Sequence, residues 1–370
     1  MTFIEGADRG LGPIVAVFVL ALLIALVVTP FVRKAVLRFG MVDRPGAARR
    51  VNTRIVPRGG GIAVAAAFLI VGAGFVILNE QVGWVPEVLT IADSDMIALF
   101  VGGAAAVVIG VVDDLLDLRA RWQLLGQIGL AVFAIALGIG VGTIANPFGA
   151  GVIRFSEPFS WGFTIFWIVG MINSINWIDG LDGLSTGVSL IAAVTLGVIS
   201  LTTQVGQPLI AVLCFALAGA LAGFLRWNFY PAKIFIGTSG VQFVGYTLAV
   251  LSILGSAKVA VALLVLGVPI LDTFWLIVRR ILDGRSPFSA DRSHIHHRLL
   301  DLGLSHQQTV LVIYGICAGL GLIALLVSEV TGLYAFLGVF VVSGLILFGP
   351  TRGAFRRPEE LEAESYEPDR

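Results

Sequence analysis

Long apolar runs, broken at intervals by short polar segments, dominate this chain. A helix that crosses a membrane needs about 20 mainly apolar residues. By that criterion the pattern predicts eleven spanning helices, of which the third and the fifth are short. They are residues 13–32, 59–78, 96–112, 123–142, 160–175, 184–202, 208–225, 240–255, 259–279, 309–328 and 332–350. The sequence therefore predicts an all-α integral membrane protein.

The composition supports this prediction. The chain is 57% hydrophobic and 13% charged, whereas soluble domains carry about 25% charged residues. The two cysteines, Cys214 and Cys317, lie in apolar runs, so they indicate neither a disulfide framework nor a zinc ligand set. The first residues lack the basic start and cleavage site of a signal peptide, so we expect the first helix to be retained.

The positive charges predict an orientation. Of the 24 lysines and arginines, all except Arg9, Arg154 and Lys258 follow odd-numbered predicted helices. The positive-inside rule places those segments in the cytoplasm. We expect a multi-pass plasma-membrane protein with its N-terminus outside and its C-terminus inside. Residues 1–350 would form the membrane domain, and residues 351–370 a disordered cytoplasmic tail.

Three aspartates follow the third predicted helix: Asp113, Asp114 and Asp117. The spacing of Asp113 and Asp117 puts them on one helical face, where like charges repel unless a divalent cation lies between them. Mg²⁺ prefers such oxygen ligands and often shares them with substrate phosphates. A solvated helix end is an equally good explanation of this motif taken alone.

Three further polar segments fall on the same predicted side: "NSINWIDGLDGL", "FIGTSG" and "DRSHIHHRLLDLGL". In the first, polar residues recur every three positions and so line one side of a helical turn, whereas a polar seam between helices would leave two aspartates without a role. In the last, His and Arg side chains suit anionic phosphate groups; a zinc site lacks the usual companions, and a merely basic loop is the alternative. The candidate residues are Asn173, Asn176, Asp179, Asp182, His294, His296, His297 and Arg298.

A transporter is the competing interpretation from another class. Transporters place ionisable residues near the bilayer midplane, within broken helices. Here the acids lie at predicted helix ends on one side, which favours an enzyme.

Taken in order, "VDRPGAARRVNTRIVPRGGG", "VVDDLLDLR", "NSINWIDGLDGL", "FIGTSG" and "HIHHRLLDLGL" resemble the polyprenyl-phosphate N-acetylhexosamine-1-phosphate transferases of glycosyltransferase family 4. The form "HIHHRL" and the eleven predicted spans look like the undecaprenyl-phosphate GlcNAc-1-phosphate branch rather than the phospho-MurNAc-pentapeptide branch. The resemblance implies a reaction in which a polyprenyl phosphate attacks a UDP-N-acetylhexosamine at the cytoplasmic face and UMP leaves. It implies a lipid-bilayer setting and a role in envelope glycans such as lipopolysaccharide or teichoic acid.

The resemblance also implies roles for single residues. Asp113, Asp114 and Asp117 would be catalytic, together with the loop residues His294, His296, His297 and Arg298. Asn173, Asp179 and Asp182 would bind the nucleotide-sugar. Asn176, Asp113 and Asp114 would hold Mg²⁺, or Mn²⁺ in its place. Nothing indicates a nucleic-acid partner, and the sequence leaves a homodimer open.

One departure from the family pattern stands out. The family usually has a metal-binding aspartate where this chain has Thr238, and a threonine offers only a neutral oxygen. An inactive relative that binds nucleotide-sugar or lipid is therefore a second alternative. Because the other carboxylates are present, we expect an active enzyme.

Overall fold

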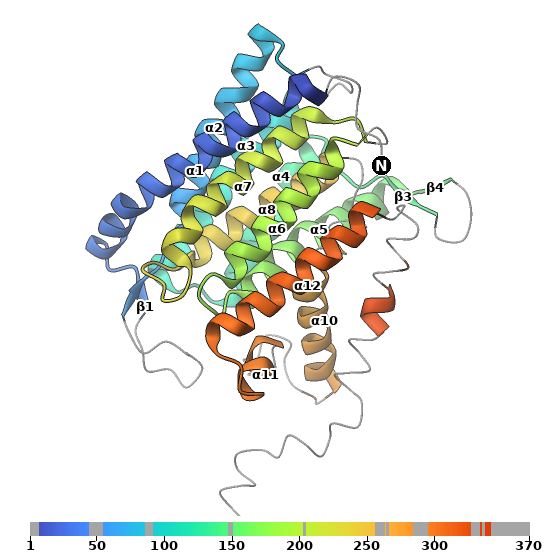
Figure 1. Cartoon of the computed structure of the whole chain (residues 1–370). Helices are drawn as coiled ribbons and strands as arrows, with labels where there is room; N and C mark the ends of the chain where they lie inside the picture. The colour runs from blue at the N-terminus through green and yellow to red at the C-terminus, as the bar shows by residue number, and fades with distance from the viewer. Residues whose placement is uncertain are drawn as a thin grey trace, which may run out of the picture.

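A computed structural model describes the helical body of the chain (Figure 1). The described residues are 7–43, 55–85, 92–146, 151–202, 205–255, 263, 266–282, 284, 295–326, 334 and 337–341. The predicted tail, residues 351–370, lies outside them.

The described part is an all-α bundle with two short hairpins, as the apolar pattern predicts. Seven of the described helices are long and apolar enough to cross a membrane, and α4 and α6 are shorter apolar helices. The helices are α1 (Ala7–Arg38), α2 (Gly61–Val82), α3 (Asp93–Leu116), α4 (Ala120–Ala136), α5 (Glu157–Ile178), α6 (Leu184–Ser200), α7 (Pro208–Asn228), α8 (Gly237–Leu254), α10 (Gly267–Leu282), α11 (Ile295–Asp301) and α12 (His306–Leu326). The number eleven stays a prediction, because most of residues 332–350 lie outside the described part.

The third and fifth predicted spans are longer than expected. Helix α3 extends to Leu116 and α5 to Ile178, whereas hydropathy ends both several residues earlier. In α3 the last turn contains Asp113 and Asp114, which are 6% and 2% exposed. The prediction that these aspartates follow the span is wrong, because their carboxylates accept hydrogen bonds from other parts of the protein and can stay within the helix.

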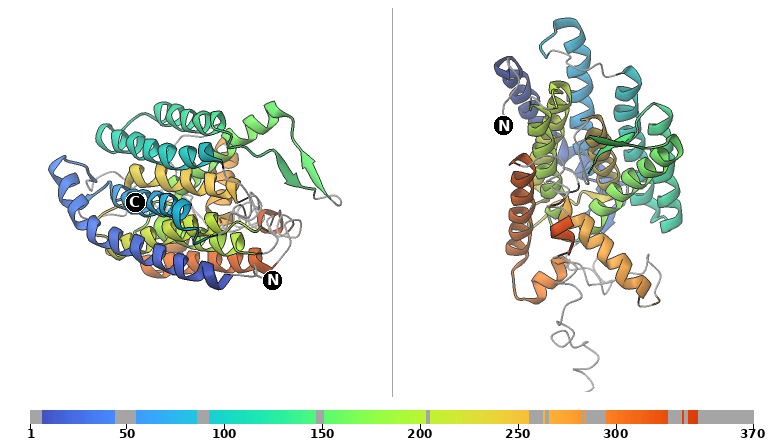
Figure 2. Two further views of the ribbon diagram at one scale, coloured as in Figure 1. Left: turned by 90° about the horizontal axis from the view of Figure 1, so that it is seen from above. Right: turned by 90° about the vertical axis from the view of Figure 1, so that its right-hand side faces the viewer.

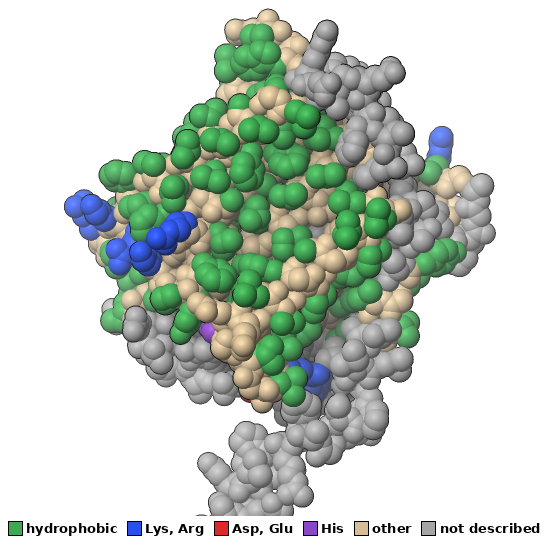
Figure 3. Space-filling model, viewed as in Figure 1, with side chains coloured by type: hydrophobic (Ala, Val, Ile, Leu, Met, Phe, Trp, Pro, Cys, Tyr) green, Lys and Arg blue, Asp and Glu red, His purple; other side chains and the backbone are tan. Residues whose placement is uncertain are grey.

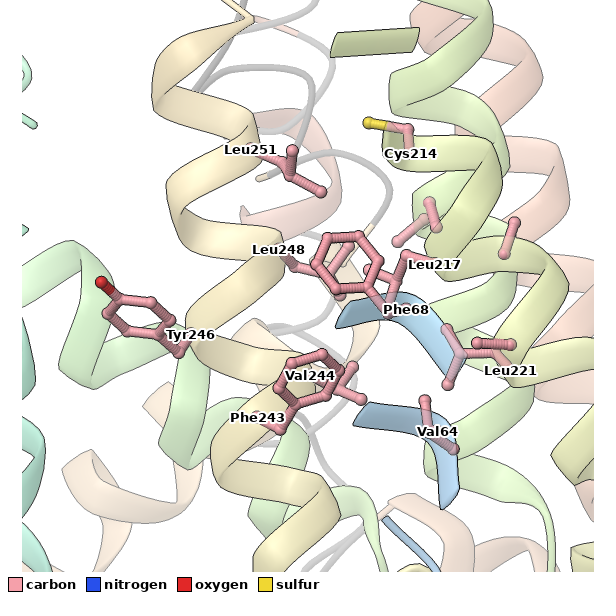
Figure 4. Packing of buried hydrophobic residues seen from close by; sticks show 14 of the residues in the cluster. Val64, Phe68, Cys214, Leu217, Leu221, Phe243, Val244, Tyr246, Leu248 and Leu251 are labelled. Atoms are coloured by element: carbon pink, nitrogen blue, oxygen red, sulfur yellow. The ribbon is translucent and has the colours of Figure 1, made fainter. Parts of the chain in front are cut away.

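The core lies along α7 and α8, which most other helices surround (Figures 1 and 2). In each of these two helices 83% of the apolar 18-residue stretch is buried, whereas in α1 the figure is 22%. Phe68 of α2, Leu217 and Leu221 of α7, and Phe243 of α8 pack in one cluster (Figure 4). The outer helices instead expose apolar side chains over a broad face (Figure 3), which suits contact with lipid.

The two hairpins mark opposite ends of the bundle. Strand β1 (Val42–Asp43) pairs with β2 (Val56–Pro57) between α1 and α2. Strand β3 (Thr143–Ala145) pairs with β4 (Val152–Arg154) and projects from the other end, before α5 (Figure 2). The chain from β2 also contacts the segment before α8, because Phe235 N–H donates to the Pro57 carbonyl (2.8 Å) and Gly60 N–H to the Phe235 carbonyl (2.8 Å).

Helix α3 lies directly against the backbone of α8 at Gly110. A Cβ atom at this position would lie 2.3 Å from the Ser239 Cα and 2.6 Å from the Thr238 carbonyl oxygen. Both neighbours are backbone atoms, so they have little freedom to move away. The absence of a side chain at Gly110 therefore sets the distance between the two helices.

Replacing Gly110 with Ala should destabilise the protein by about 1–3 kcal/mol, the usual cost of overpacking. Gly129→Ala is the matched control, because a Cβ on that α4 residue meets nothing within 4 Å. The measurement is the thermal unfolding midpoint of each purified protein in detergent. Midpoints that fall equally in both variants, or in neither, would contradict this account of the α3–α8 contact.

Candidate active site

The carboxylate of Asp114 joins the last turn of α3 to the first turn of α8. Its Oδ1 accepts the Thr238 N–H (2.9 Å), and its Oδ2 accepts the Ser239 N–H (3.0 Å). Backbone N–H groups at a helix N-terminus lack partners within the helix and favour a negative charge. Gly237 adopts φ +72°, and a Cβ there would lie 2.7 Å from the Asp114 Oδ2. Glycine at 237 therefore permits this close approach.

Arg58 closes the same junction from the segment between β2 and α2. Its Nε and Nη2 donate to the Asp114 carbonyl oxygen (3.1 and 2.8 Å). Its Nη2 also donates to the Asp117 Oδ1 (2.6 Å). One guanidinium thus satisfies a carbonyl at the end of α3 and pairs with the carboxylate that follows it.

The predicted pairing of Asp113 and Asp117 on one helical face is wrong. Asp117 ends α3 in the left-handed region, with φ 47°, so its side chain leaves the helix and is 78% exposed. The carboxylate of Asp113 points elsewhere, where its Oδ1 accepts the Leu118 N–H (3.0 Å) and the Gln123 Nε2–H (2.7 Å). Both hydrogen bonds end on Oδ1, so the Asp113 Oδ2 has no hydrogen-bond donor among the described residues and stays open to a ligand.

Asn173, Asn176 and Asp179, the polar residues that recur at the end of α5, differ in their side-chain contacts. The Asn173 amide donates to the Gln127 Oε1 of α4 (2.6 Å). Asp179 follows the helix, and its Oδ1 accepts the Ser185 hydroxyl of α6 (2.6 Å). No hydrogen bond to the Asn176 side chain is found within the described part of the chain. Asn176 is therefore the member of this set whose amide stays available to a ligand.

Asp182 connects the turn between α5 and α6 to two other segments. Its Oδ2 accepts the Ala232 N–H (2.8 Å) in the connection between α7 and α8. Its own N–H donates to the Nε2 of His306 (2.9 Å), the first residue of α12. This turn, residues 179–183, is held in place by residues distant in sequence.

Helix α11 brings the histidine segment to the same turn. His296 is 1% exposed, and a Cβ at Gly180 would lie 2.5 Å from its Nε2. The Ile295 N–H, at the start of α11, donates to the Asp272 Oδ1 of α10 (2.9 Å). Arg298 is partly buried in the same helix. His294 and the side chain of His297 lie outside the described residues.

Charge is concentrated around Asp179, which lies beyond the end of α5. Burial raises the pKa of Asp179 to about 7, the Ser185 hydrogen bond opposes this rise, and the negative charges of Asp114 and Asp182 add to it. These electrostatic effects place the three carboxylates in one region. A carboxyl group there exchanges its proton near neutral pH.

Comparison with known proteins identifies the family of this chain. The family model described as glycosyl transferase family 4 matches residues 96–256. A Bacillus subtilis protein, "Probable undecaprenyl-phosphate N-acetylglucosaminyl 1-phosphate transferase", is 38% identical over 92% of this chain and 91% of its own length. The chain belongs to glycosyl transferase family 4.

More distant relatives in this family carry similar names. A Mycolicibacterium smegmatis "Decaprenyl-phosphate N-acetylglucosaminephosphotransferase" is 34% identical over 84% of this chain and 80% of its own length. A Yersinia pestis "Undecaprenyl-phosphate alpha-N-acetylglucosaminyl 1-phosphate transferase" is 28% identical over 85% of each chain.

Several residues that shape this candidate site receive no role from the sequence motifs. Arg58 stands beside three glycines in "PRGGG", Gln123 and Gln127 lie one turn apart on α4, and His306 begins an apolar helix. Their partners are distant in sequence or on another helix. The signal in the sequence is weak, being a polar residue within an otherwise apolar or glycine-rich segment.

The Asp179 pKa predicts a pH dependence of stability. Because the folded pKa lies above the ordinary value of about 3.9, the folded protein keeps a proton that the unfolded chain loses. Stability contributed by this group therefore falls as pH rises from about 4 to about 7. Asp179→Asn removes this dependence, so its unfolding midpoint should rise relative to the parent protein between pH 5 and pH 8.

A second variant tests the Asp179 pKa by raising it further. Ser185→Ala removes the hydrogen bond that lowers the Asp179 pKa, so the pH-dependent loss of stability should extend to higher pH. If the unfolding midpoints of Asp179→Asn and the parent protein differ by the same amount at every pH from 5 to 8, Asp179 does not titrate in this range.

Proposed function

We propose that this protein transfers GlcNAc-1-phosphate from UDP-GlcNAc to a polyprenyl phosphate, releases UMP, and so begins the membrane stage of envelope glycan synthesis. The observation that carries the proposal is the 38% identity to the Bacillus subtilis relative over 92% of the chain. The convergence of Asp113, Asp114, Asp179, Asp182 and α11 at one end of the bundle supports it. A membrane-tethered acceptor requires the chemistry to lie at such an end.

The reaction is an in-line displacement at phosphorus. An oxygen of the acceptor phosphate forms a bond to the β-phosphorus of UDP-GlcNAc. The bond from that phosphorus to the bridging oxygen breaks, and UMP leaves with the electron pair. Because two anions must meet, the protein has to hold them in position and offset their repulsion.

The residues divide this work in our proposal. Asp113 positions or deprotonates the acceptor phosphate through its open Oδ2; little proton abstraction is needed, because a phosphate monoester has its second pKa near 6. Asp179 and Asp182 face the nucleotide-sugar. His296 and Arg298 of α11, with His294 and His297, donate to the diphosphate. Asp114 and Asp117 act on the site through the α3–α8 junction and Arg58.

We propose Mg²⁺ as the cofactor. The described residues contain no group of three or more His, Cys, Asp or Glu side chains that could hold a metal. A site with only one or two carboxylate ligands suits Mg²⁺, which is often bound by one or two carboxylates together with substrate phosphates and water. The ligand set predicted from the sequence, Asn176, Asp113 and Asp114, changes at Asp114, because both oxygens of that carboxylate already accept backbone N–H groups. Asn176 and the open oxygens of Asp113 and Asp179 would hold the ion. When bound, the ion would neutralise charge on the diphosphate.

We also propose that this end of the bundle faces the cytoplasm. The exposed cations Arg33, Lys34 and Arg38 lie near the C-terminal end of α1. Figure 3 shows Lys and Arg side chains gathered at one edge of the bundle. Arg226 and Lys233 lie at the same end, because the Arg33 Nε–H donates to the Lys233 carbonyl (2.9 Å) and the Trp227 Nε1–H donates to the Leu26 carbonyl of α1 (3.1 Å). The positive-inside rule assigns such an end to the cytoplasm, where UDP-sugars are made.

The direct test is UMP release by the purified protein with UDP-GlcNAc, polyprenyl phosphate and Mg²⁺ in detergent, beside a panel of other UDP-sugars. We expect UMP release that requires the lipid, and a loss of at least about 100-fold in Asp113→Asn, as is typical when a general base is removed. Gly129→Ala serves as the folded, active control. Binding of UDP-GlcNAc without UMP release would support an inactive relative instead.

Thr238 allows a sharper test of the metal proposal. It lies in the first turn of α8, beside Asp114, where the family usually has a metal-binding aspartate. A carboxylate there should attract Mg²⁺ more strongly than a hydroxyl, since hard cations gain most from charged oxygens. Thr238→Asp should therefore lower the Mg²⁺ concentration for half-maximal activity by several-fold, and Thr238→Asn should not. Loss of activity in Thr238→Asp at every Mg²⁺ concentration would mean that the neutral residue is required.

A further inference from the structure

Among the described residues, the start of α12 makes a polar contact with the turn at residues 179–183. The Nε2 of His306 accepts the Asp182 N–H at 2.9 Å. A backbone N–H can only donate, so this geometry requires an unprotonated Nε2, with the ring proton on Nδ1. The His306 ring also packs on Tyr230, with 4.5 Å between ring centroids and an angle of 31° between planes.

The position of His306 is itself well defined. Ser305 and Gln308 form a reciprocal N-cap, in which the Ser305 N–H donates to the Gln308 Oε1 (2.8 Å) and the Gln308 N–H to the Ser305 Oγ (3.3 Å). Further along α12, the Tyr314 hydroxyl donates to the Gly183 carbonyl. Helix α12 therefore contacts the turn at two adjacent residues, Asp182 and Gly183.

The same residue lies close to the histidine segment along the chain. Helix α11 ends in a tight turn, in which the Gly303 N–H donates to the Leu300 carbonyl (2.9 Å) and the Leu304 N–H to the Leu299 carbonyl (3.2 Å). Gly303 has φ +90°, which a left-handed C-terminal cap requires. Since only residues 302–305 separate the two helices, the position of His306 constrains that of α11.

We propose that His306 is a positioning residue for the transfer reaction, which fixes the 179–183 turn relative to α11 through the acceptor Nε2. Two histidines then contact the same turn at different residues. His296 lies against Gly180, and His306 accepts the Asp182 N–H. The inference rests on the proposed function, in which Asp179 and Asp182 face the nucleotide-sugar. It assigns a role to the histidine that lies outside the "HIHH" motif.

Two substitutions separate the acceptor from the ring. His306→Phe keeps a ring against Tyr230 and removes the acceptor, whereas His306→Gln keeps an oxygen acceptor near the Nε2 position and removes the ring. Gln307→Ala is the matched control, because Gln307 is an exposed neighbour on the same helix. The readouts are kcat and KM for each substrate, together with the unfolding midpoint.

We expect His306→Phe to raise KM for UDP-GlcNAc about ten-fold, the change produced by a loss of about 1.4 kcal/mol, with an unchanged KM for polyprenyl phosphate. His306→Gln should stay within about three-fold of the parent protein. The unfolding midpoints of all three variants should agree within a few degrees. Unchanged kinetics in His306→Phe, or equal damage in His306→Gln, would overturn the proposal.

Hydrogen exchange of the peptide that contains Asp182 provides a readout that needs no activity. The Asp182 amide should be protected in the parent protein and in His306→Gln, and should exchange faster in His306→Phe. If the parent protein releases no UMP, the proposed function fails, and the exchange data still decide whether His306 holds the turn. Equal protection in His306→Phe and the parent would reject the contact.

Discussion

The contact of the Asp114 carboxylate with the first turn of α8 determines the geometry of the site end of the bundle. A carboxylate that is 2% exposed would cost several kcal/mol without partners. Two backbone N–H groups and the nearby Arg58 offset that cost. Because α8 lies in the core and packs on α3 and α5, this junction fixes where α3 ends. The position of Asp113, one residue earlier, follows from it, and so does the place of Thr238 beside the carboxylates.

The acidic residues of the two motifs therefore serve two purposes. The carboxylates of Asp114 and Asp182 accept hydrogen bonds from backbone N–H groups of other segments, and Asp117 pairs with Arg58. Asp113, Asp179 and Asp182 each keep one carboxylate oxygen without a hydrogen-bond donor among the described residues. In a motif rich in aspartate, some carboxylates can thus connect segments of the protein, whereas others keep an oxygen available to substrate. The chemistry would fall to those whose second oxygen is open.

The sequence predicts the helical membrane fold because long apolar runs have few alternatives in a bilayer. It does not predict the end of α3, since a hydropathy window counts Asp113 and Asp114 as the limit of the span, whereas their long-range partners keep them inside the helix. Nor does it predict the left-handed conformation of Asp117, because aspartate adopts that region only where the surroundings favour it. The grouping of the four polar segments was predictable from their shared side. The contacts of Arg58 and His306 were not, because each joins residues far apart in the chain.

A neutral residue at position 238 is consistent with the electrostatics of this end. Asp114 already occupies the positive N-terminus of α8, and the negative charges of Asp114 and Asp182 already contribute to the high pKa of Asp179. A further carboxylate at 238 would add to this repulsion whenever no cation is bound. Thr238 lowers that cost in the empty site. If the proposed Mg²⁺ binds here with the diphosphate, a threonine would supply one charged ligand fewer, so position 238 would shift the balance between the stability of the empty site and its affinity for the ion.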